Sequence, residues 1–589
     1  MADSAYKKEI IMSGASDRSA PSYGGESDMP SSGVLARVVD SFKRDPHQHA
    51  TPRGVVGADG KIFDVEMAAA ATAGSPLARK LKGRHLQMIA IGGSIGSGLF
   101  VGSGSALAHG GPASLLIAFI LIGVMLFCTM HALGEMAVLF PVAGSFSAYS
   151  TRFLDPAWGF AMGWNYGLQW LVVLPLEIVS ATLTIEFWNR GRYNNDAFVA
   201  IFLAIIIAIN MFGVKGYGEA EFVFSVVKVV AVIGFIILGI ILNIGGGPNS
   251  SYIGGRFWSN PGAFHNGFKG LCSVFVTASF AFAGTELVGL AAAETANPRK
   301  SLPTAIKQVF WRITLFYVVS LTLVGLLVPY DEPRLLNGKS SVDATASPFV
   351  IAIQNAGIEG LPSVMNVVIM IAVLSVGNSA IYGSSRTLAA LAEQGQAPRI
   401  LAYIDRKGRP MAGITLASLF GFLAFLSGSE IQADAFNWMI AISGLSSILT
   451  WGSICFAHIR FRKGWSVQGH SLSELAFVSA PGVWGSYLGL FLNILVLIAQ
   501  FWTGFAPIGY REMTPSERSI NWLQAYLALP IVMLMYVPYK LLYRTSVVRS
   551  FNMDLHSGIR ELNLQELIAE ERAEAAAWPA WRRFYKFLC

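Results

Sequence analysis

The sequence predicts an all-α integral membrane protein with about twelve transmembrane helices, of which the first and the sixth are broken near their middles. Composition supplies the first observation, because 53% of the 589 residues are hydrophobic and only 13% are charged. That leaves too little polar surface for a soluble globule. The second observation is that apolar residues fall in repeated runs of about 20, the length that crosses a hydrocarbon core as a helix. The third is that glycines and polar side chains interrupt two of these runs.

The apolar runs separate two polar tails. We expect a disordered cytoplasmic N-terminal tail over residues 1–82, a transmembrane domain over 83–543 and a cytoplasmic C-terminal tail over 544–589. In the C-terminal tail, residues 561–577 are rich in helix formers and predict a helix that lies on the inner membrane face or docks on the body. In order, the predicted spans are approximately 86–108, 113–139, 157–187, 196–212, 219–242, 271–293, 303–328, 361–384, 411–428, 436–458, 486–504 and 522–541.

Basic residues in two loops set the predicted orientation. The positive-inside rule places these loops, and with them both termini, in the cytoplasm. The net charge of +7 is then explained by inner loops and tails, so it does not indicate nucleic-acid binding. The basic residues are Arg386, Arg399, Arg406, Lys407 and Arg409 after the eighth span, and Arg460, Arg462 and Lys463 after the tenth.

The first span contains the glycine-rich stretch GGSIGSG at residues 92–98. A glycine inside a helix costs about 1 kcal/mol relative to alanine, so this stretch predicts two half-helices joined by unwound backbone, with Gly96 near its centre. Irregular backbone inside a membrane persists only where it is buried in protein or lines a cavity, because its polar groups need partners. We expect a solute to be that partner. The alternative is that these glycines only form small-residue surfaces for helix packing.

The sixth span is interrupted over residues 280–286, which place Gly284, Thr285 and Glu286 near mid-membrane. An ionisable side chain at that depth costs a few kcal/mol and usually faces a pathway or a partner. Interruptions in spans one and six make them equivalent members of two five-helix halves. That arrangement indicates an inverted-repeat transporter with its site at the midplane.

Together the two interruptions predict a receptor for a zwitterion. The half-helix that begins near Ser97 and Gly98 offers unpaired amides and a positive dipole end, which suit a carboxylate. The carbonyl groups of Phe280, Ala281 and Ala283 can accept hydrogen bonds from an ammonium group. A molecule bearing both charges fits such a pair of receptors.

Four segments carry a resemblance to a known family: GRHLQMIAIGGSIGSGLFVGSG, LGEMAVLFPVAGSFSAY, FAFAGTELVGLAAAETANPRKSLP and FNWMIAISGLSSILTWGSICFAHIRFR. They resemble the fungal amino-acid permeases of the amino acid-polyamine-organocation superfamily, and are most similar to general permeases. The resemblance implies the LeuT-type fold with a 5+5 inverted repeat, a plasma-membrane location and proton-driven amino-acid uptake, with Phe280 as a gate. The implied substrate contacts are the backbone of Ser94, Ser97 and Gly98 with the carboxylate, and the carbonyls of Phe280, Ala281 and Ala283 with the amine.

Proton coupling needs groups whose charge can change while they are buried. Lys228 lies about nine residues into the fifth span, and it matches the placement of a lysine that replaces a sodium ion in related bacterial transporters. The alternative is that Lys228 extends to the cytoplasmic interface. Glu286 is the second candidate, either as a proton carrier or as a structural link to neighbouring helices. Glu135 and Glu177 are weaker candidates, because interhelical hydrogen bonding also explains them.

We therefore predict proton-coupled import of amino acids across the plasma membrane by alternating access, with a broad substrate range. The alternative is an amino-acid sensor that binds amino acids but transports little. Expected partners are amino acids, protons, the lipid bilayer and a ubiquitin ligase acting on the N-terminal tail. We expect no metal, no cofactor and no enzyme activity, since no nucleophile, base or metal cluster occurs at usable spacing. The tail lysines are Lys7, Lys8, Lys43 and Lys61.

Overall fold

The computed structural model describes residues 34–44, 63–93, 95–189, 192–249, 251–336, 347–428, 431–560 and 563–582. The chain divides into two compact units, Met1–Lys43 and Arg44–Cys589. Within its described residues, the first unit contains one helix, α2 (Val34–Ser41). The second unit contains the apolar helices and is the part that holds the predicted site.

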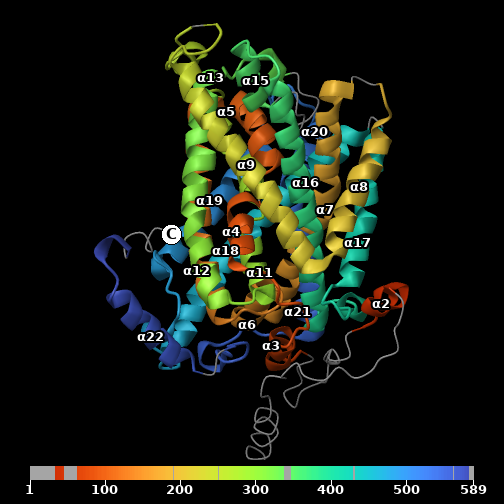
Figure 1. The fold of residues 1–589 in the computed structure, drawn as a ribbon, viewed down its shortest axis with the longest axis vertical. Coiled ribbons are helices and arrows are strands. Elements are labelled where there is room, and N and C mark those ends of the chain that lie inside the picture. Colours follow the sequence, from red (N-terminus) through yellow and green to blue (C-terminus); the bar gives the residue numbers. More distant parts are fainter. Residues whose placement is uncertain are drawn as a thin grey trace, which may run out of the picture. The chain divides into compact units, whose positions relative to one another are not determined.

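Long helices run side by side in the second unit (Figure 1). The only β pairing among the described residues is two isolated bridges, so the predicted all-α class is confirmed. The long helices are α5 (Ser103–Leu139), which contains a turn at Gly111, α7 (Pro156–Asn189), α8 (Asn195–Met211), α9 (Gly213–Asn243), α16 (Leu361–Glu393), α17 (Met411–Gly421) continued by η7 (Phe422–Gly428), α18 (Ile431–Val467) and α19 (Gly482–Phe505).

The remaining spans are built from shorter pieces. These are α4 (Gly83–Gly92) with η1 (Gly98–Gly102), α10 (Gly267–Phe282) with α11 (Leu287–Ala291) and η3 (Ala292–Glu294), α12 (Pro298–Arg312) with η4 (Ile313–Val319) and α13 (Ser320–Leu327), and α20 (Pro515–Tyr526) with α21 (Ala528–Tyr543). Outside the spans lie α3 (Val65–Ala73), α6 (Phe146–Phe153), α14 (Pro333–Leu336), α15 (Pro348–Asn355) and α22 (Leu564–Ala576), the last of which falls within the predicted helix 561–577.

The twelve predicted ranges are helical over most of their described residues. By length and composition, eight described helices could each cross a membrane, or nine when the bent pair α20 and α21 counts as one span. The lower number has a structural reason. The apolar helices Asn195–Met211 and Met411–Leu426 are short. The segment Gly98–Leu139, which counts once, contains parts of two predicted spans.

The turn between the first two spans lies inside α5. Gly111 has a φ of +77°, a conformation that favours glycine, and a Cβ at this position would lie 2.8 Å from the carbonyl oxygen of Ala263. Pro112 follows and has no N–H to continue the helical ladder. The first span therefore ends at about Gly110, close to the predicted boundary.

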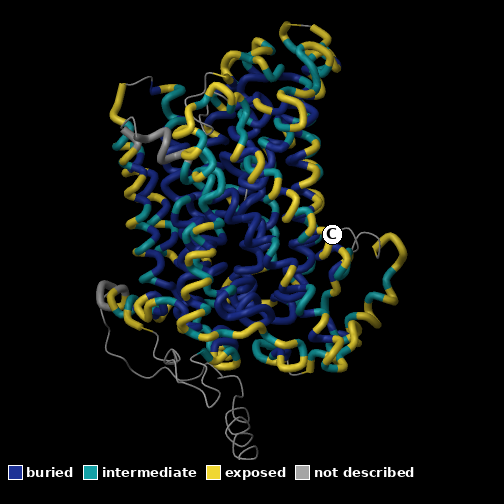
Figure 2. The backbone as a smooth tube through the Cα atoms, turned by 180° about the vertical axis from the view of Figure 1, so that it is seen from behind, coloured by how far each residue is buried: buried dark blue, intermediate teal, exposed yellow. Residues whose placement is uncertain are grey.

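The polar interior gathers around α7 and α16. Figure 2 shows buried backbone at the centre of the helices and exposed backbone on the outside. In α7, 78% of the most apolar window is buried, against 28% in α19. Large apolar side chains of α19, such as Phe491 and Ile498, are exposed, and a surface of this kind suits contact with lipid.

Residues 63–82, which we expected in the disordered tail, are folded in the second unit. Asp64 caps α3 by accepting backbone N–H groups of its first turn, and Ala68 and Thr72 of α3 are buried. Leu81 then pairs with the backbone at Thr295. Sequence reasoning missed this segment because small alanines, rather than a sustained apolar period, form its packing surface.

Candidate functional site

The first break lies where it was predicted, between the end of α4 at Gly92 and the start of η1 at Gly98. Ser94, a predicted substrate contact, lies outside the described residues. A Cβ added at Gly96 would lie 2.5 Å from Cγ2 of Val376 in α16. The glycines of this span thus allow both the break and close helix packing, so the two interpretations made from the sequence each describe part of the structure.

The second break lies between α10 and α11, where Gly284 has a φ of +95°. The N–H of Ala283 donates to the carbonyl of Phe280 over 3.2 Å, and the hydroxyl of Thr285 donates to the carbonyl of Phe282 over 2.7 Å. A carbonyl oxygen has two lone pairs. The Phe280 carbonyl, predicted to hold an ammonium group, therefore already accepts one hydrogen bond and retains capacity for another.

The two breaks contact each other through their backbones. A Cβ added at Gly98 would lie 2.4 Å from Cα of Ala281 and 2.9 Å from its backbone nitrogen. Neither atom can move without moving the helix, so only glycine fits at this point. The start of the second half of span one thus lies directly against the last turn of α10, the arrangement that we predicted for a zwitterion receptor.

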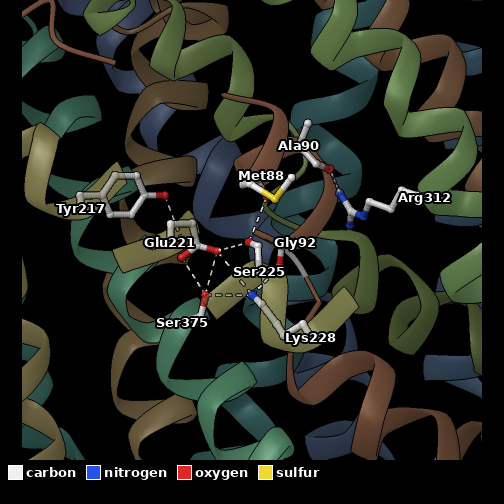
Figure 3. A network of polar contacts seen from close by, with 10 residues as sticks. Met88, Ala90, Gly92, Tyr217, Glu221, Ser225, Lys228, Arg312 and Ser375 are labelled. Atoms are coloured by element: carbon white, nitrogen blue, oxygen red, sulfur yellow. Dashed lines mark hydrogen bonds and ion pairs between the residues drawn. The ribbon is translucent and has the colours of Figure 1, made fainter. Parts of the chain in front are cut away.

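Lys228 lies wholly buried beside the first break (Figure 3). Its Nζ donates to the carbonyl of Gly92 over 2.5 Å and to the hydroxyl of Ser375 over 2.9 Å, and it lies 3.4 Å from Oε1 of Glu221. These partners belong to α4, α16 and α9. The side chain therefore links three helices inside the protein, whereas the interface alternative would direct it toward water.

Glu221 is a member of this cluster that sequence reasoning missed. Its carboxylate is wholly buried and accepts the Ser375 hydroxyl over 2.8 and 2.7 Å. Ser225 also donates to it, over 3.3 Å, and to the carbonyl of Met88 over 3.1 Å. Glu221 lies seven residues before Lys228, close to two helical turns, so both side chains occupy one face of α9. That spacing was the available signal.

Glu286 ties the second break to two other helices. Its carboxylate accepts the hydroxyl of Tyr166 in α7 over 3.0 Å, the indole N–H of Trp451 in α18 over 3.1 Å and the backbone N–H of Gly284 over 3.1 Å. Three donors converge on one wholly buried carboxylate. These contacts match the structural link that we considered beside the proton-carrier role.

Glu177 of α7 reaches the first break. Its Oε1 accepts the hydroxyl of Ser97 over 2.6 Å, while its Oε2 is buried and has no hydrogen-bond partner among the described residues. Glu135, in contrast, is satisfied by His458, Arg462 and the N–H of Ser479. Of the two weaker candidates, Glu177 therefore contacts the site, and Glu135 belongs to a separate hydrogen-bonded cluster.

Arg312, at the end of α12, was also missed by sequence reasoning. Its guanidinium is wholly buried and donates to the carbonyl of Ala90 over 3.0 Å and to the hydroxyl of Thr285 over 2.8 Å. It therefore contacts both interrupted spans. The sequence analysis did not single out this position, although it lies only 27 residues after Thr285 of the second break.

The geometry offers complementary groups at one place. The first amides of a half-helix have no intrahelical acceptor and carry the positive end of its dipole, and these lie at Ser97–Gly98. Carbonyls of the last turn of α10 lie opposite them, around Ala281. Among the described residues, no group of three or more His, Cys, Asp or Glu side chains could hold a metal ion.

A family model and known proteins match most of the chain. A family model described as "Amino acid permease" matches residues 85–550. The chain is 58% identical to the general amino-acid permease GAP2 of Candida albicans, covering 94% of this chain and 93% of that protein. It is 56% identical to the general amino-acid permease GAP1 of Saccharomyces cerevisiae, covering 93% and 91%. Among solved structures, a manganese transporter of Eremococcus coleocola aligns with a TM-score of 0.47 at 12% identity, covering 81% of this chain and 95% of that one.

Proposed function

The chain belongs to the amino acid permease family, and from this membership we propose that it imports amino acids across the plasma membrane together with protons, by alternating access about the two broken helices. Membership also makes it a transporter rather than an enzyme. We include a broad substrate range in the proposal, because relatives at 58% and 56% identity are named general amino-acid permeases.

One observation supports the proposal most directly, namely the backbone contact between Gly98 and Ala281. It brings a half-helix start, which attracts a carboxylate, against carbonyls that attract an ammonium group. Every amino acid has these two groups, whatever its side chain. A receptor built from main-chain groups therefore suits a transporter that accepts many amino acids.

The Lys228 cluster is the proposed site of proton coupling. A protonated Lys228 can donate at once to the carbonyl of Gly92 and to Ser375, and it is neutralised by Glu221. A neutral amine has fewer protons to donate and loses its attraction to the negative end of α4. Loading or loss of one proton would thus change how firmly α4 is held, which couples proton transfer to movement of the first half-helix.

The same proposal includes topology and partners. Both termini lie in the cytoplasm, because the most basic loops follow the eighth and tenth spans. Lysines of the N-terminal tail, including Lys43, are then accessible to a cytoplasmic ubiquitin ligase. Epitope accessibility at each terminus in intact and permeabilised cells tests the orientation.

Uptake of labelled amino acids by permease-deficient yeast cells tests the function. We expect accumulation of several amino acids, competition between them, faster uptake from acidic medium and loss of accumulation when a protonophore collapses the proton gradient. Accumulation of a single amino acid would refute the broad range, and accumulation that survives the protonophore would refute proton coupling.

A binding measurement, combined with uptake, distinguishes the sensor alternative from a transporter. A sensor is favoured by two results together. An amino acid stabilises the purified protein against heat, but cells that carry the protein at their surface do not accumulate that amino acid. A transporter gives both stabilisation and accumulation.

A further inference from the structure

Arg312 is a buried guanidinium that the function described so far does not use. Its side chain is wholly buried, and among the described residues its hydrogen bonds go to one carbonyl and two hydroxyl groups, with none to a carboxylate. A cation without a carboxylate is costly inside a membrane protein. Such a residue needs a compensating role.

Its contacts lie at both breaks at once. Its Nη1 donates to the carbonyl of Ala90, in the last turn of α4, and to the hydroxyl of Thr285, inside the second break. Nη2 donates to the hydroxyl of Tyr317 over 3.1 Å, and that hydroxyl donates to the carbonyl of Ala281 over 2.8 Å. The chain of contacts therefore runs from α4 to the residue that packs against Gly98.

Local winding of the helix makes this chain possible. Immediately after Arg312 the helix becomes the π-helix η4 (Ile313–Val319). In a π-helix hydrogen bonds join residues five apart, so this winding brings Arg312 and Tyr317 closer to one side of the helix than α-helical winding at 3.6 residues per turn would. π-Helical turns are frequent at functional sites.

The charge is balanced by helix ends. The carbonyl groups at the end of α4 form the negative end of its dipole, and both Arg312 and Lys228 donate to this end, at Ala90 and Gly92 (Figure 3). The two cations come from different helices, α12 and α9. Lys228 is paired with Glu221 and can lose its proton, whereas an arginine side chain keeps its charge.

We propose that Arg312 is a positioning residue that, through Ala90, Thr285 and Tyr317, holds the two breaks in register so that their backbone groups form a single amino-acid receptor. The proposal rests on the proposed function. A permanently charged, planar group suits this task, because its fork of donors can satisfy several acceptors at fixed geometry. Lysine carries its three donors on a single nitrogen and cannot reproduce this planar fork.

Two substitutions test the proposal. Arg312→Lys keeps the charge but loses the fork, and we expect the KM for uptake to rise roughly tenfold, the effect of about 1.4 kcal/mol, with a smaller change in the maximal rate. Tyr317→Phe removes one hydroxyl from the middle of the chain of contacts and keeps the ring, whose centroid lies 4.0 Å from that of Phe282. We expect about a fivefold rise in KM from the loss of such neutral hydrogen bonds.

The pH profile of uptake gives a readout that general damage to the fold would not give. Because neither substitution removes a contact of Lys228 or Glu221, both variants are expected to keep the wild-type profile while KM rises. Tyr487→Phe, on the exposed side of α19, is the matched control and should leave KM unchanged. Tyr317→Phe keeps the test valid if Arg312→Lys fails to reach the surface.

Failure of this inference can be told from failure of the proposed function. If the wild-type protein transports but both variants at normal surface amounts keep the wild-type KM, Arg312 has no positioning role. A lower maximal rate at unchanged KM likewise contradicts that role. If the wild-type protein does not transport, the proposed function fails, and amino-acid-induced thermal stabilisation of the purified variants still measures the receptor, with a weaker affinity expected in both.

Discussion

At the scale of single residues, Lys228 and Glu221 form a wholly buried ion pair at the edge of the first break. Taking two charges out of water costs several kcal/mol per ion unless further hydrogen bonds compensate. Here Gly92 and Ser375 supply those bonds. Because this pair contacts the end of α4, the gain or loss of one proton can change the contact between Lys228 and Gly92.

We predict that Lys228→Met abolishes the pH dependence of uptake, because methionine fills a similar volume but can neither donate to Gly92 nor carry a proton. Initial uptake rates measured from acidic to neutral medium check this. The substitution leaves the buried Glu221 carboxylate without its cation. If this lowers the amount of Lys228→Met at the cell surface, the double variant with Glu221→Gln should restore that amount without restoring the pH dependence. Lys215→Met, at an exposed position of the same helix α9, is the matched control, and an unchanged pH profile in Lys228→Met would remove that residue from coupling.

Glu286 gives a contrasting prediction. Three donors converge on its carboxylate, and glutamine would replace one accepting oxygen by an NH₂ group, so that at least one buried donor loses its partner. An unsatisfied buried group costs about 1–3 kcal/mol. We expect Glu286→Gln to lower the thermal stability of the purified protein and the maximal uptake rate while the pH profile persists. Loss of the pH profile would instead assign Glu286 to proton transfer.

At the scale of helices, composition and run length predicted the positions of the twelve spans. A glycine cluster predicted the first break, and Gly284, Thr285 and Glu286 within an apolar run predicted the second. Packing partners were not predictable in this way. The link from Arg312 through Tyr317 to Ala281 runs along η4, which is wound as a π-helix, and nothing in the residues of that segment sets it apart from an α-helix. Glu221 was predictable from its spacing to Lys228, but a carboxylate near the end of a span also suits an interface.

Gly98 shows where a helix break depends on one missing atom. Because a Cβ would lie 2.4 Å from Cα of Ala281, Gly98→Ala must push the two half-helices apart, and overpacking of this kind costs about 1–3 kcal/mol. Since about 1.4 kcal/mol corresponds to a factor of ten, we expect uptake to fall at least tenfold while the protein still reaches the surface.

The control for this prediction is Gly234→Ala in α9, where nothing lies within 4 Å of the added Cβ. There the substitution should leave uptake intact, because alanine is favoured over glycine in a helix interior. Equal uptake by the two variants would mean that contact between the breaks is not needed for transport. Gly96→Leu, whose side chain meets Val376, is expected to behave as Gly98→Ala does.

At the scale of the whole second unit, the segment after α21 packs against α6, the turn after α5 and the end of the broken sixth span. Arg152 donates to the carbonyls of Asp554 and Ser557 over 2.5 and 2.7 Å. Arg560 donates to the carbonyls of Pro141 and Ala293, each over 2.8 Å, and Ala293 belongs to η3 at the end of the broken sixth span. The polar sequence of this segment gave no sign of docking, because the contacts are made by arginines to backbone carbonyls.

This docking should not respond to pH near neutrality. Burial alone would raise the pKa of Asp554, but the Arg152 guanidinium and the N–H groups of His556 and Ser557 lower it below its ordinary value. A carboxylate with a lowered pKa contributes stability that is complete above its ordinary pKa and is lost only as the pH falls through the lowered one. Under the proposed function, we therefore expect Asp554 to contribute nothing to the pH response of uptake near neutrality.

We therefore expect Asp554→Asn to destabilise the purified protein by about 1–2 kcal/mol, the worth of a charge-assisted hydrogen bond, and by the same amount at every pH between about 5 and 8. Thermal unfolding of both proteins across that range measures the difference. The pH profile of uptake should keep its wild-type form in Asp554→Asn. Arg549→Ala, at an exposed position of the same segment, is the control. A stability difference that shrinks toward pH 5, or an altered pH profile, would place a pH-sensitive element in the tail and weaken the assignment of coupling to Lys228.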